Sequence, residues 1–341
     1  MNLPYRTRRI LRRFGIFLLT AAVIFALVWL CWVIWLQRYV VYTRDGAVLD
    51  FSRSAQSLSG VEAREPTQGA TVGIYYNEGE NLITPDNSLT QISGVYADTA
   101  AILADQSGVA SALRARSEGA VMLDVKSIYG NFFYSTGISG ASSASGVDVS
   151  AMDGLIRDLN AKGLYTIARV PAFRDRSFGL NNTSSGLPTE EGYLWEDDEG
   201  CYWLNPADSG TITYLVRIAT ELRELGFREV VFTEFAFPDT DQVVISSEGT
   251  KAEILAKAAS DLVSACAAEG FAVSFASTDP TLAIPAGRSR LYLMGVDASA
   301  AASVAAQTTV EDKQVNLVFL ADTNDTRFDS YSVLRALSTE G

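Results

Sequence analysis

The feature that most constrains the fold of this chain is an alternation of short apolar runs with longer amphipathic stretches. The apolar runs predict seven strands, at residues 91–96, 120–125, 164–170, 228–239, 271–275, 289–294 and 315–320. Helices are predicted at residues 99–116, 151–161, 212–225, 250–269 and 329–337. Strands that alternate with helices form a parallel sheet covered by helices. Because about 250 residues are available, we predict an α/β fold of the TIM-like (β/α) barrel type, either irregular or with an eighth strand from before residue 91.

The fourth predicted strand, residues 228–239, is apolar on both faces, which is typical of a buried parallel strand between crossover helices. Glu234 lies inside this run, near its carboxyl end. A carboxylate is costly to bury there unless it is paired or used in chemistry. Since α/β barrels build their active sites at the carboxyl ends of their strands, Glu234 is the first candidate catalytic residue.

Carboxylates also follow other predicted strands, and the full set at strand ends is Asp124, Glu234, Asp279, Asp297 and Asp322. In a barrel these ends meet on one face, and glycoside hydrolysis usually requires two carboxylates across a sugar ring. We predict Glu234 as general acid or nucleophile, with Asp124 as its catalytic partner or a substrate ligand. Asp279 and Asp297 are predicted to bind substrate. The alternative is that these two residues and Asp322 cap helices or bind loop amides.

Basic side chains near the strand ends are candidate substrate ligands. Lys126 follows the second predicted strand, and Arg169 lies in the third. Both are predicted to bind substrate, since arginine in particular holds carboxylates and phosphates through two hydrogen bonds. Alternatively, Arg169 and the nearby Arg174 neutralise the candidate catalytic carboxylates, or Lys126 pairs with Asp124.

Two tryptophans lie on the long loop that follows the third predicted strand. Trp195 and Trp203 flank a pair of aspartates, and aromatic faces beside acidic groups commonly grip sugar rings. We therefore predict that both tryptophans bind substrate. The alternative is a loop that folds on its own aromatic cluster.

The start of the chain has the pattern of a membrane anchor. Residues 14–36 are uncharged and apolar, and as a helix they extend about 35 Å, enough to cross a bilayer. The run is too long for an ordinary signal peptide, and no A-x-A-like cleavage site follows it. Five arginines precede it, so we predict a cytoplasmic tail at residues 1–13, a single-pass anchor at 14–36 and an extracytoplasmic C-terminal domain in the cell membrane. Residues 37–90 are predicted to hold a hairpin around Asp45-Gly46 and a linker, and residues 91–341 the barrel domain.

Composition excludes several classes of function. Residues 41–341 carry 21 basic and 40 acidic side chains, so we expect no nucleic-acid partner. The chain has no histidine, which excludes Ser-His-Asp and Cys-His catalysis and histidine-ligated zinc. It has no CxxC or other metal spacing, so no metal and no cofactor are predicted. Cys201 and Cys266 either form one disulfide outside the cell or are two buried thiols.

Four motifs occur in a fixed order: AVMLDVK at 120–126, YTIARVPAFRD at 165–175, WEDDEGCYWLNP at 195–206 and LGFREVVFTEFAFP at 225–238. Together they resemble the putative glycosyl hydrolase domain family of bacterial envelope proteins, which is related to the α-amylase-type barrels. The resemblance covers about residues 91–320. It implies a TIM-like barrel that acts on a cell-envelope polysaccharide or peptidoglycan.

The fourth-strand motif departs from the family pattern, Phe-Asp-Tyr-Val-Arg-Phe-Pro. Thr233 stands at the family's Asp position, Glu234 at its Tyr position and Ala236 at its Arg position. Because side chains alternate between faces along a strand, Glu234 is not expected to replace the aspartate without a bulge or register slip. The resemblance therefore leaves two functions open, a glycoside hydrolase and a catalytically degenerate barrel that binds glycan or scaffolds a partner.

Overall fold

The computed structural model describes residues 40–43, 46–49, 89–268 and 270–338. The chain divides into two compact units, Met1–Glu80 and Asn81–Gly341. In the first unit, strands β1 (Val40–Thr43) and β2 (Gly46–Leu49) pair antiparallel, in agreement with the hairpin expected there. The predicted tail, anchor and linker lie outside the described residues. Within the part that is described, no helix has the length and apolarity needed to cross a membrane.

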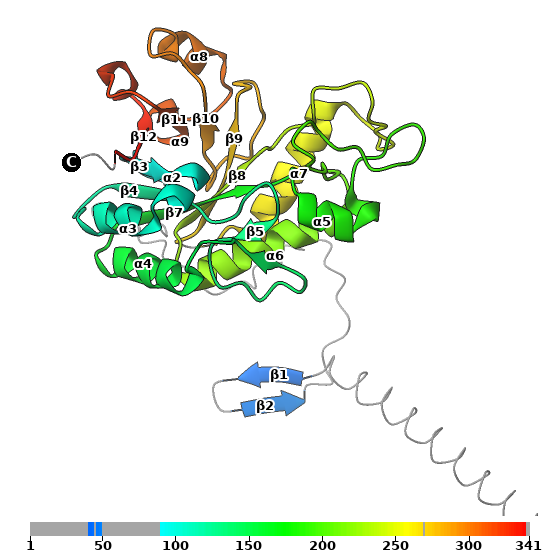
Figure 1. The fold of residues 1–341 in the computed structure, drawn as a ribbon, viewed down its shortest axis with the longest axis horizontal. Coiled ribbons are helices and arrows are strands. Elements are labelled where there is room, and N and C mark those ends of the chain that lie inside the picture. Colours follow the sequence, from blue (N-terminus) through cyan, green and yellow to red (C-terminus); the bar gives the residue numbers. More distant parts are fainter. Residues whose placement is uncertain (1–39, 44–45, 50–88, 269, 339–341) are drawn as a thin grey trace, which may run out of the picture. The chain divides into compact units, whose positions relative to one another are not determined.

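The second unit contains a closed barrel of eight parallel strands (Figure 1). In ring order the strands are β3 (Ser93–Ala97), β4 (Ala120–Asp124), β7 (Tyr165–Pro171), β8 (Glu229–Thr233), β9 (Ala272–Ser277), β10 (Leu291–Leu293), β11 (Leu317–Ala321) and β12 (Ser332–Ala336). Every neighbouring pair is parallel, including the closing pair of β12 with β3. The predicted TIM-like barrel is therefore confirmed.

The eighth strand comes from a segment for which the sequence prediction was wrong. Residues 329–337 were expected to be helical, but they contain β12, which pairs with β11 on one side and β3 on the other. No strand from before residue 91 is needed, and the ring is regular. Val333 is buried on the helix side of the strand and Leu334 inside the barrel, so burial on both faces favours a strand.

Helices cover the outside of the ring. Those longer than eight residues are α3 (Gln106–Arg114), α4 (Val149–Ala161), α6 (Ser209–Leu225) and α7 (Lys251–Cys266), and they pack in chain order as α3 on α4, α4 on α6 and α6 on α7 (Figure 1). The single helix predicted at 99–116 is divided into α2 (Thr99–Ala104) and α3. Asp105 ends α2, and its carboxylate caps α3 by accepting from the backbone N–H of Gly108.

Shorter elements fill the connections. They are β5 (Asn131–Phe132), β6 (Ser142–Ser143), α5 (Arg176–Asn181), the 3₁₀ turns η2 (Thr183–Ser185) and η3 (Thr326–Phe328), α8 (Ala301–Gln307) and α9 (Lys313–Asn316). Two of them, α5 and η2, lie in the long loop that follows β7 and shape the surface beside the barrel.

Side chains that point into the barrel form a core of their own. Met122, Ile167 and Val231 belong to this inner cluster, while their neighbours Val121, Ala168 and Val230 pack under the helices. Because faces alternate along a strand, the positions two residues further on also point inward. Those positions are Asp124, Arg169 and Thr233, at the carboxyl ends of β4, β7 and β8.

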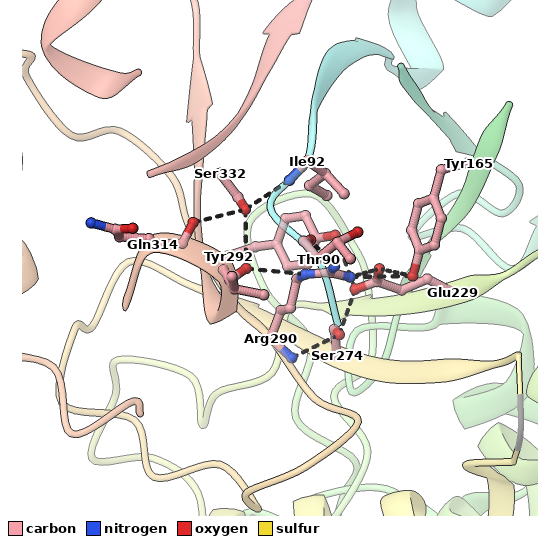
Figure 2. Close-up of polar contacts among 10 residues, drawn as sticks. Thr90, Ile92, Tyr165, Glu229, Ser274, Arg290, Tyr292, Gln314 and Ser332 are labelled. Atoms are coloured by element: carbon pink, nitrogen blue, oxygen red, sulfur yellow. Dashed lines mark hydrogen bonds and ion pairs between the residues drawn. The ribbon is translucent and has the colours of Figure 1, made fainter. Parts of the chain in front are cut away.

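A buried polar network fills the opposite end of the barrel (Figure 2). Glu229 and Arg290 form an ion pair there, 2.5 Å between Oε2 and Nη1, with both side chains fully buried. The Glu229 carboxylate also accepts hydrogen bonds from Tyr165, Ser274 and Tyr292, and the Arg290 guanidinium donates to the carbonyls of Thr90 and Val315 and to the hydroxyl of Tyr165. The charges are thus paired and hydrogen-bonded, as a buried ion pair requires, and this end has a structural role.

Candidate functional site

A cavity of about 450 Å³ opens at the carboxyl end of the strands, and we call it the rim cavity. Its lining residues are Thr99, Leu103, Asp124, Lys126, Ser127, Ile128, Tyr129, Asn131, Phe133, Ala144, Ser145, Arg169, Pro171, Thr233, Glu234 and Met294. The cavity brings together four residues singled out from the sequence, Asp124, Lys126, Arg169 and Glu234. Parallel strands that end at one rim are the reason these distant residues meet.

Glu234 faces the rim cavity because the strand ends one residue before it. β8 stops at Thr233, and Glu234 adopts φ 50°, in the left-handed region. The alternation of faces is thereby broken, so Thr233 and Glu234 both line the cavity. Glu234 was expected to take the place of the family's aspartate only if the ideal strand is interrupted, and the end of β8 together with the left-handed backbone of Glu234 is such an interruption. A side chain in this backbone region costs about 1–2 kcal/mol, and such strain is concentrated at functional sites.

The carboxyl group of Glu234 is available to a ligand in the rim cavity. Within residues 89–268 and 270–338 it forms no hydrogen bond and no ion pair. Burial raises its pKa above the ordinary glutamate value; Arg174 opposes this shift, while Asp197 and Glu199 reinforce it. A carboxyl group that keeps its proton to higher pH and has no competing partner is suited to donate a proton to a ligand.

Asp124, by contrast, is fully engaged by the protein. The Arg169 guanidinium forms a bidentate ion pair with it: Nε donates to Oδ1, and Nη2 donates to Oδ2 at 2.9 Å. Thr99 adds two hydrogen bonds to Oδ2, from its backbone N–H at 2.6 Å and from its hydroxyl at 2.8 Å. The ion pair between Asp124 and Arg169, one of the two alternatives, is therefore present. It also occupies the guanidinium that was predicted to bind substrate.

Lys126 lines the rim cavity, but its ammonium group has a protein partner. Nζ lies 2.7 Å from Oδ2 of Asp175, and both side chains are fully buried. The Tyr214 hydroxyl donates to the same carboxylate at 2.8 Å, and the backbone N–H of Phe178 to its other oxygen at 2.8 Å. These contacts favour a structural role for Lys126 over the predicted contact with substrate.

The two tryptophans form a cluster on the loop that follows β7. Trp203 donates to Asp197 at 2.9 Å, and Arg174 forms an ion pair with the same carboxylate at 2.5 Å. Trp195 lies with its ring centre 6.5 Å from that of Trp203 and donates to Gln242. Neither tryptophan lines the rim cavity. The arrangement fits the alternative of a loop folded on its own aromatic cluster, and Arg174 is paired within it instead of with Glu234.

The aspartates after the later strands also lie outside the rim cavity. Asp279 accepts hydrogen bonds from the backbone N–H and hydroxyl of Thr281, at 2.8 and 2.7 Å, which is the loop-amide role named as its alternative. Asp297 is exposed, and its backbone carbonyl accepts from Ala300. Asp322 accepts from the hydroxyl of Tyr96 at 2.5 Å. None of the three lines the rim cavity, although Asp322 is connected to the Asp124–Arg169 pair through Tyr96, whose ring centre lies 5.6 Å from the Arg169 guanidinium.

Several cavity residues were not identified as ligands from the sequence. Tyr129 and Leu103 are large apolar side chains, 41% and 51% exposed, and both line the rim cavity. Met294 and Thr99 lie after β10 and β3. These residues are not part of a recognisable motif. Their position after a barrel strand is the sequence signal by which they could have been found.

The described residues contain no cluster of three or more acidic or cysteine side chains that could hold a metal ion. The open question about Cys201 and Cys266 is answered, because both are buried free thiols. Burial raises the pKa of each thiol to about 11, so both are protonated and unreactive near neutral pH.

The geometry defines the class of protein: a TIM-like barrel with its cavity, and a strained glutamate, at the carboxyl rim. Residues 94–273, more than half of the chain, match the model of the putative glycosyl hydrolase domain family, and the chain belongs to this family. No curated protein matches the chain.

Solved structures with a similar barrel include two α-galactosidases. The enzyme from Lactobacillus brevis has a TM-score of 0.50 at 9% identity, over 73% of this chain and 38% of its own. A GH36 enzyme from Geobacillus stearothermophilus, in complex with 1-deoxygalactonojirimycin, has a TM-score of 0.50 at 10% identity, over 73% and 39%. A hypothetical protein from Ruminiclostridium thermocellum has a TM-score of 0.46 at 20% identity, over 53% and 96%. At these identities the likeness is one of fold, and this chain spans about two-fifths of the galactosidase chains.

Proposed function

We propose that this protein is a glycoside-hydrolase-like protein that acts on carbohydrate of the cell envelope, bound in the rim cavity. Family membership supports the carbohydrate theme. The observation that carries the proposal is Glu234, held at the carboxyl rim of the barrel with a strained backbone, a raised pKa and no partner among the described residues. Strain and burial of this kind are tolerated where a side chain is used.

The proposed reaction begins with proton transfer from Glu234 to the glycosidic oxygen. The bond between that oxygen and the anomeric carbon breaks, and water adds to the carbon and gives up a proton. Asp124 is the second carboxylate of the cavity and the candidate base or nucleophile. For that role it must exchange part of its contact with Arg169 for contact with water or sugar, because its Oδ2 already accepts three hydrogen bonds.

A second candidate function is glycan binding without turnover. Two observations favour it: the ion pair that neutralises Asp124, and the hydroxyl of Thr233 at the position where the family has an aspartate. In this case Glu234 hydrogen-bonds a sugar hydroxyl, and the apolar side chains at the mouth of the cavity pack against the ring.

We further propose that the barrel is anchored in the cell membrane by residues 14–36 and works outside the cytoplasm. The support is the sequence pattern: five arginines before a long apolar run. In that location the ligand is peptidoglycan or another envelope polysaccharide. A protease-protection assay on intact cells tests the orientation, with cleavage of the barrel domain as the expected result.

The decisive experiment measures sugar release from purified cell wall by the full-length protein in detergent. Glu234→Gln removes the titratable proton and keeps the shape of the side chain, and Glu190→Gln, at an exposed glutamate outside the rim cavity, is the matched control. Loss of release in the Glu234 variant alone supports hydrolysis. Background release by both wild type and variant, with retained binding to cell wall, supports the binding function. Absence of both release and binding would refute the proposal.

A further inference from the structure

A second cavity, of about 760 Å³, lies beside the barrel and shares no lining residue with the rim cavity. We call it the lateral cavity. Its walls come from the loop at 130–141, from the segment of α5 and η2, and from the first turns of α6. Its size is in the range of sites that hold small molecules.

The lining of the lateral cavity is polar but almost uncharged. Of its 17 lining residues none is acidic, although residues 41–341 carry 40 acidic side chains, and Arg217 is the one charged residue. The other polar residues are serines, asparagines, threonine and tyrosine. Such a surface is built to exchange many neutral hydrogen bonds, which fits a polyhydroxylated ligand better than a metal ion or a strongly charged one.

Many of these polar groups are available to a ligand. Among the described residues, the hydroxyls of Ser139, Ser177, Ser184 and Ser209 form no hydrogen bond. Ser185 is only 4% exposed, yet it lines the cavity, and its hydroxyl forms no hydrogen bond within residues 89–268 and 270–338. These hydroxyls are therefore available to hydrogen-bond a ligand or water in the cavity.

The two asparagines of the wall are fixed in place by the backbone. Asn181 donates to the carbonyl of Ser177 at 2.9 Å, and Asn182 to the carbonyl of Phe178 at 3.0 Å. These bonds use one donor of each amide and leave the side-chain oxygens without a protein donor among the described residues. Fixed amide oxygens that accept from ligand hydroxyls lose little entropy on binding.

An aromatic pair contributes to the lateral cavity. The rings of Phe178 and Tyr214 are stacked at 3.8 Å and 11°. Tyr214 is held by its hydrogen bond to Asp175, which is itself paired with the buried Lys126, so the pair is rigid. Phe178 is only half-buried, and a rigid aromatic face beside hydroxyls and amides is suited to the C–H face of a sugar ring.

We propose that the lateral cavity is a second saccharide-binding site, for a neutral oligosaccharide segment, independent of the chemistry at the rim. The ring face stacks on Phe178, hydroxyl groups pair with the serines and with Asn181 and Asn182, and Arg217 donates to a ring or hydroxyl oxygen. The two cavities share no lining residue, so we expect each to bind its ligand without the other.

The test is isothermal titration of the full-length protein in detergent with chitohexaose and cellohexaose as neutral probes. The double variant Asn181→Ala/Arg217→Ala is expected to bind the better probe at least tenfold more weakly, since it removes two hydrogen-bonding groups. Arg223→Ala is the matched control, because Arg223 is exposed on the same helix but does not line the cavity. Glu234→Gln tests independence from the rim. Unchanged thermal unfolding shows that each variant is folded.

Three outcomes overturn the inference. Polygalacturonate is titrated as an acidic probe for comparison. If neither neutral probe binds the wild type, or if only polygalacturonate binds, the proposed ligand class is wrong. If the double variant binds like the wild type, the cavity is not the site. If Glu234→Gln alone abolishes binding, the saccharide is held at the rim, and the proposed function stands without a second site. Conversely, if Glu234→Gln loses sugar release but still binds the neutral probe, the substitution affects only the rim cavity and the second site is supported.

Discussion

The buried ion pair between Lys126 and Asp175 allows a sharp prediction about stability. Both side chains are fully buried, and Asp175 accepts three bonds: from Lys126 at 2.7 Å, from Tyr214 at 2.8 Å and from Phe178 N–H at 2.8 Å. Asp175→Asn keeps the shape but removes the charge, so the ammonium group is left in the interior without a counterion. Breaking one side of a buried pair costs about 3–5 kcal/mol.

This loss is large enough to measure by two independent methods. In urea unfolding of the full-length protein in detergent, the free energy of unfolding should fall by about 3–5 kcal/mol. For a domain of this size the melting temperature should fall by about 6–20 °C. The matched control is Asp261→Asn, which breaks the exposed pair of Lys257 and Asp261 at 2.5 Å, one helical turn apart. Because solvent screens that pair, a loss of only about 0.3–0.5 kcal/mol is expected there.

Equal destabilisation by Asp175→Asn and Asp261→Asn would contradict a special cost of the buried charge. A loss below about 1 kcal/mol for Asp175→Asn would mean that Lys126 is already neutral, or hydrated, in the folded state, contrary to the burial of its side chain. A second variant, Lys126→Met/Asp175→Leu, removes both charges. It should recover most of the lost stability, because no unpaired charge is left in the interior.

Three further predictions concern the rim cavity. Glu234→Gly should raise the free energy of unfolding, measured in urea, by about 0.5–1 kcal/mol, because glycine adopts φ 50° without strain. Glu234→Gln keeps the strain and serves as the control. Equal effects of the two substitutions would contradict the strain at this position. Burial raises the pKa of Glu234 in the folded state, so its contribution to stability is fully present below the unfolded pKa and is lost as pH rises through the folded pKa. Sugar release should fall over the same range of rising pH. In Glu234→Gln the loss of stability with rising pH should disappear. If it is unchanged in this variant, another group is responsible for it. Thr233→Asp restores the aspartate of the family pattern beside Glu234 and should raise sugar release from cell wall, while no gain over wild type would speak against a nucleophile at this position.

The barrel could be predicted from the sequence because its evidence is local. Each buried strand is a short apolar run, and each helix an amphipathic one, so seven of the eight ring strands and the four long helices were found in the right order. The segment of β12 was missed because its few apolar residues suit a helix as well. The segment forms a strand because it pairs with the edges of both β11 and β3 and so closes the ring, which is a property of the assembled barrel.

The site was predictable only in part, for a similar reason. That Asp124 and Glu234 share a cavity follows from parallel strands ending together. The direction of Glu234 depends on one backbone angle at the end of β8, which strand periodicity cannot supply. Likewise, the pairings of Asp124 with Arg169 and of Lys126 with Asp175 depend on distances between strands and loops. The sequence shows that such charges are present but does not assign their partners.

The seam of the ring joins strands that are far apart along the polypeptide: Ile92 bonds to Ser332, 240 positions later. During synthesis, therefore, the edges of β3 and β11 that pair with β12 stay unpaired until β12 has been synthesised. An open edge beside a half-formed barrel can pair with another copy of itself. A nascent or C-terminally trimmed chain should for this reason depend on chaperones, and the seam is where degradation of an incomplete molecule would begin.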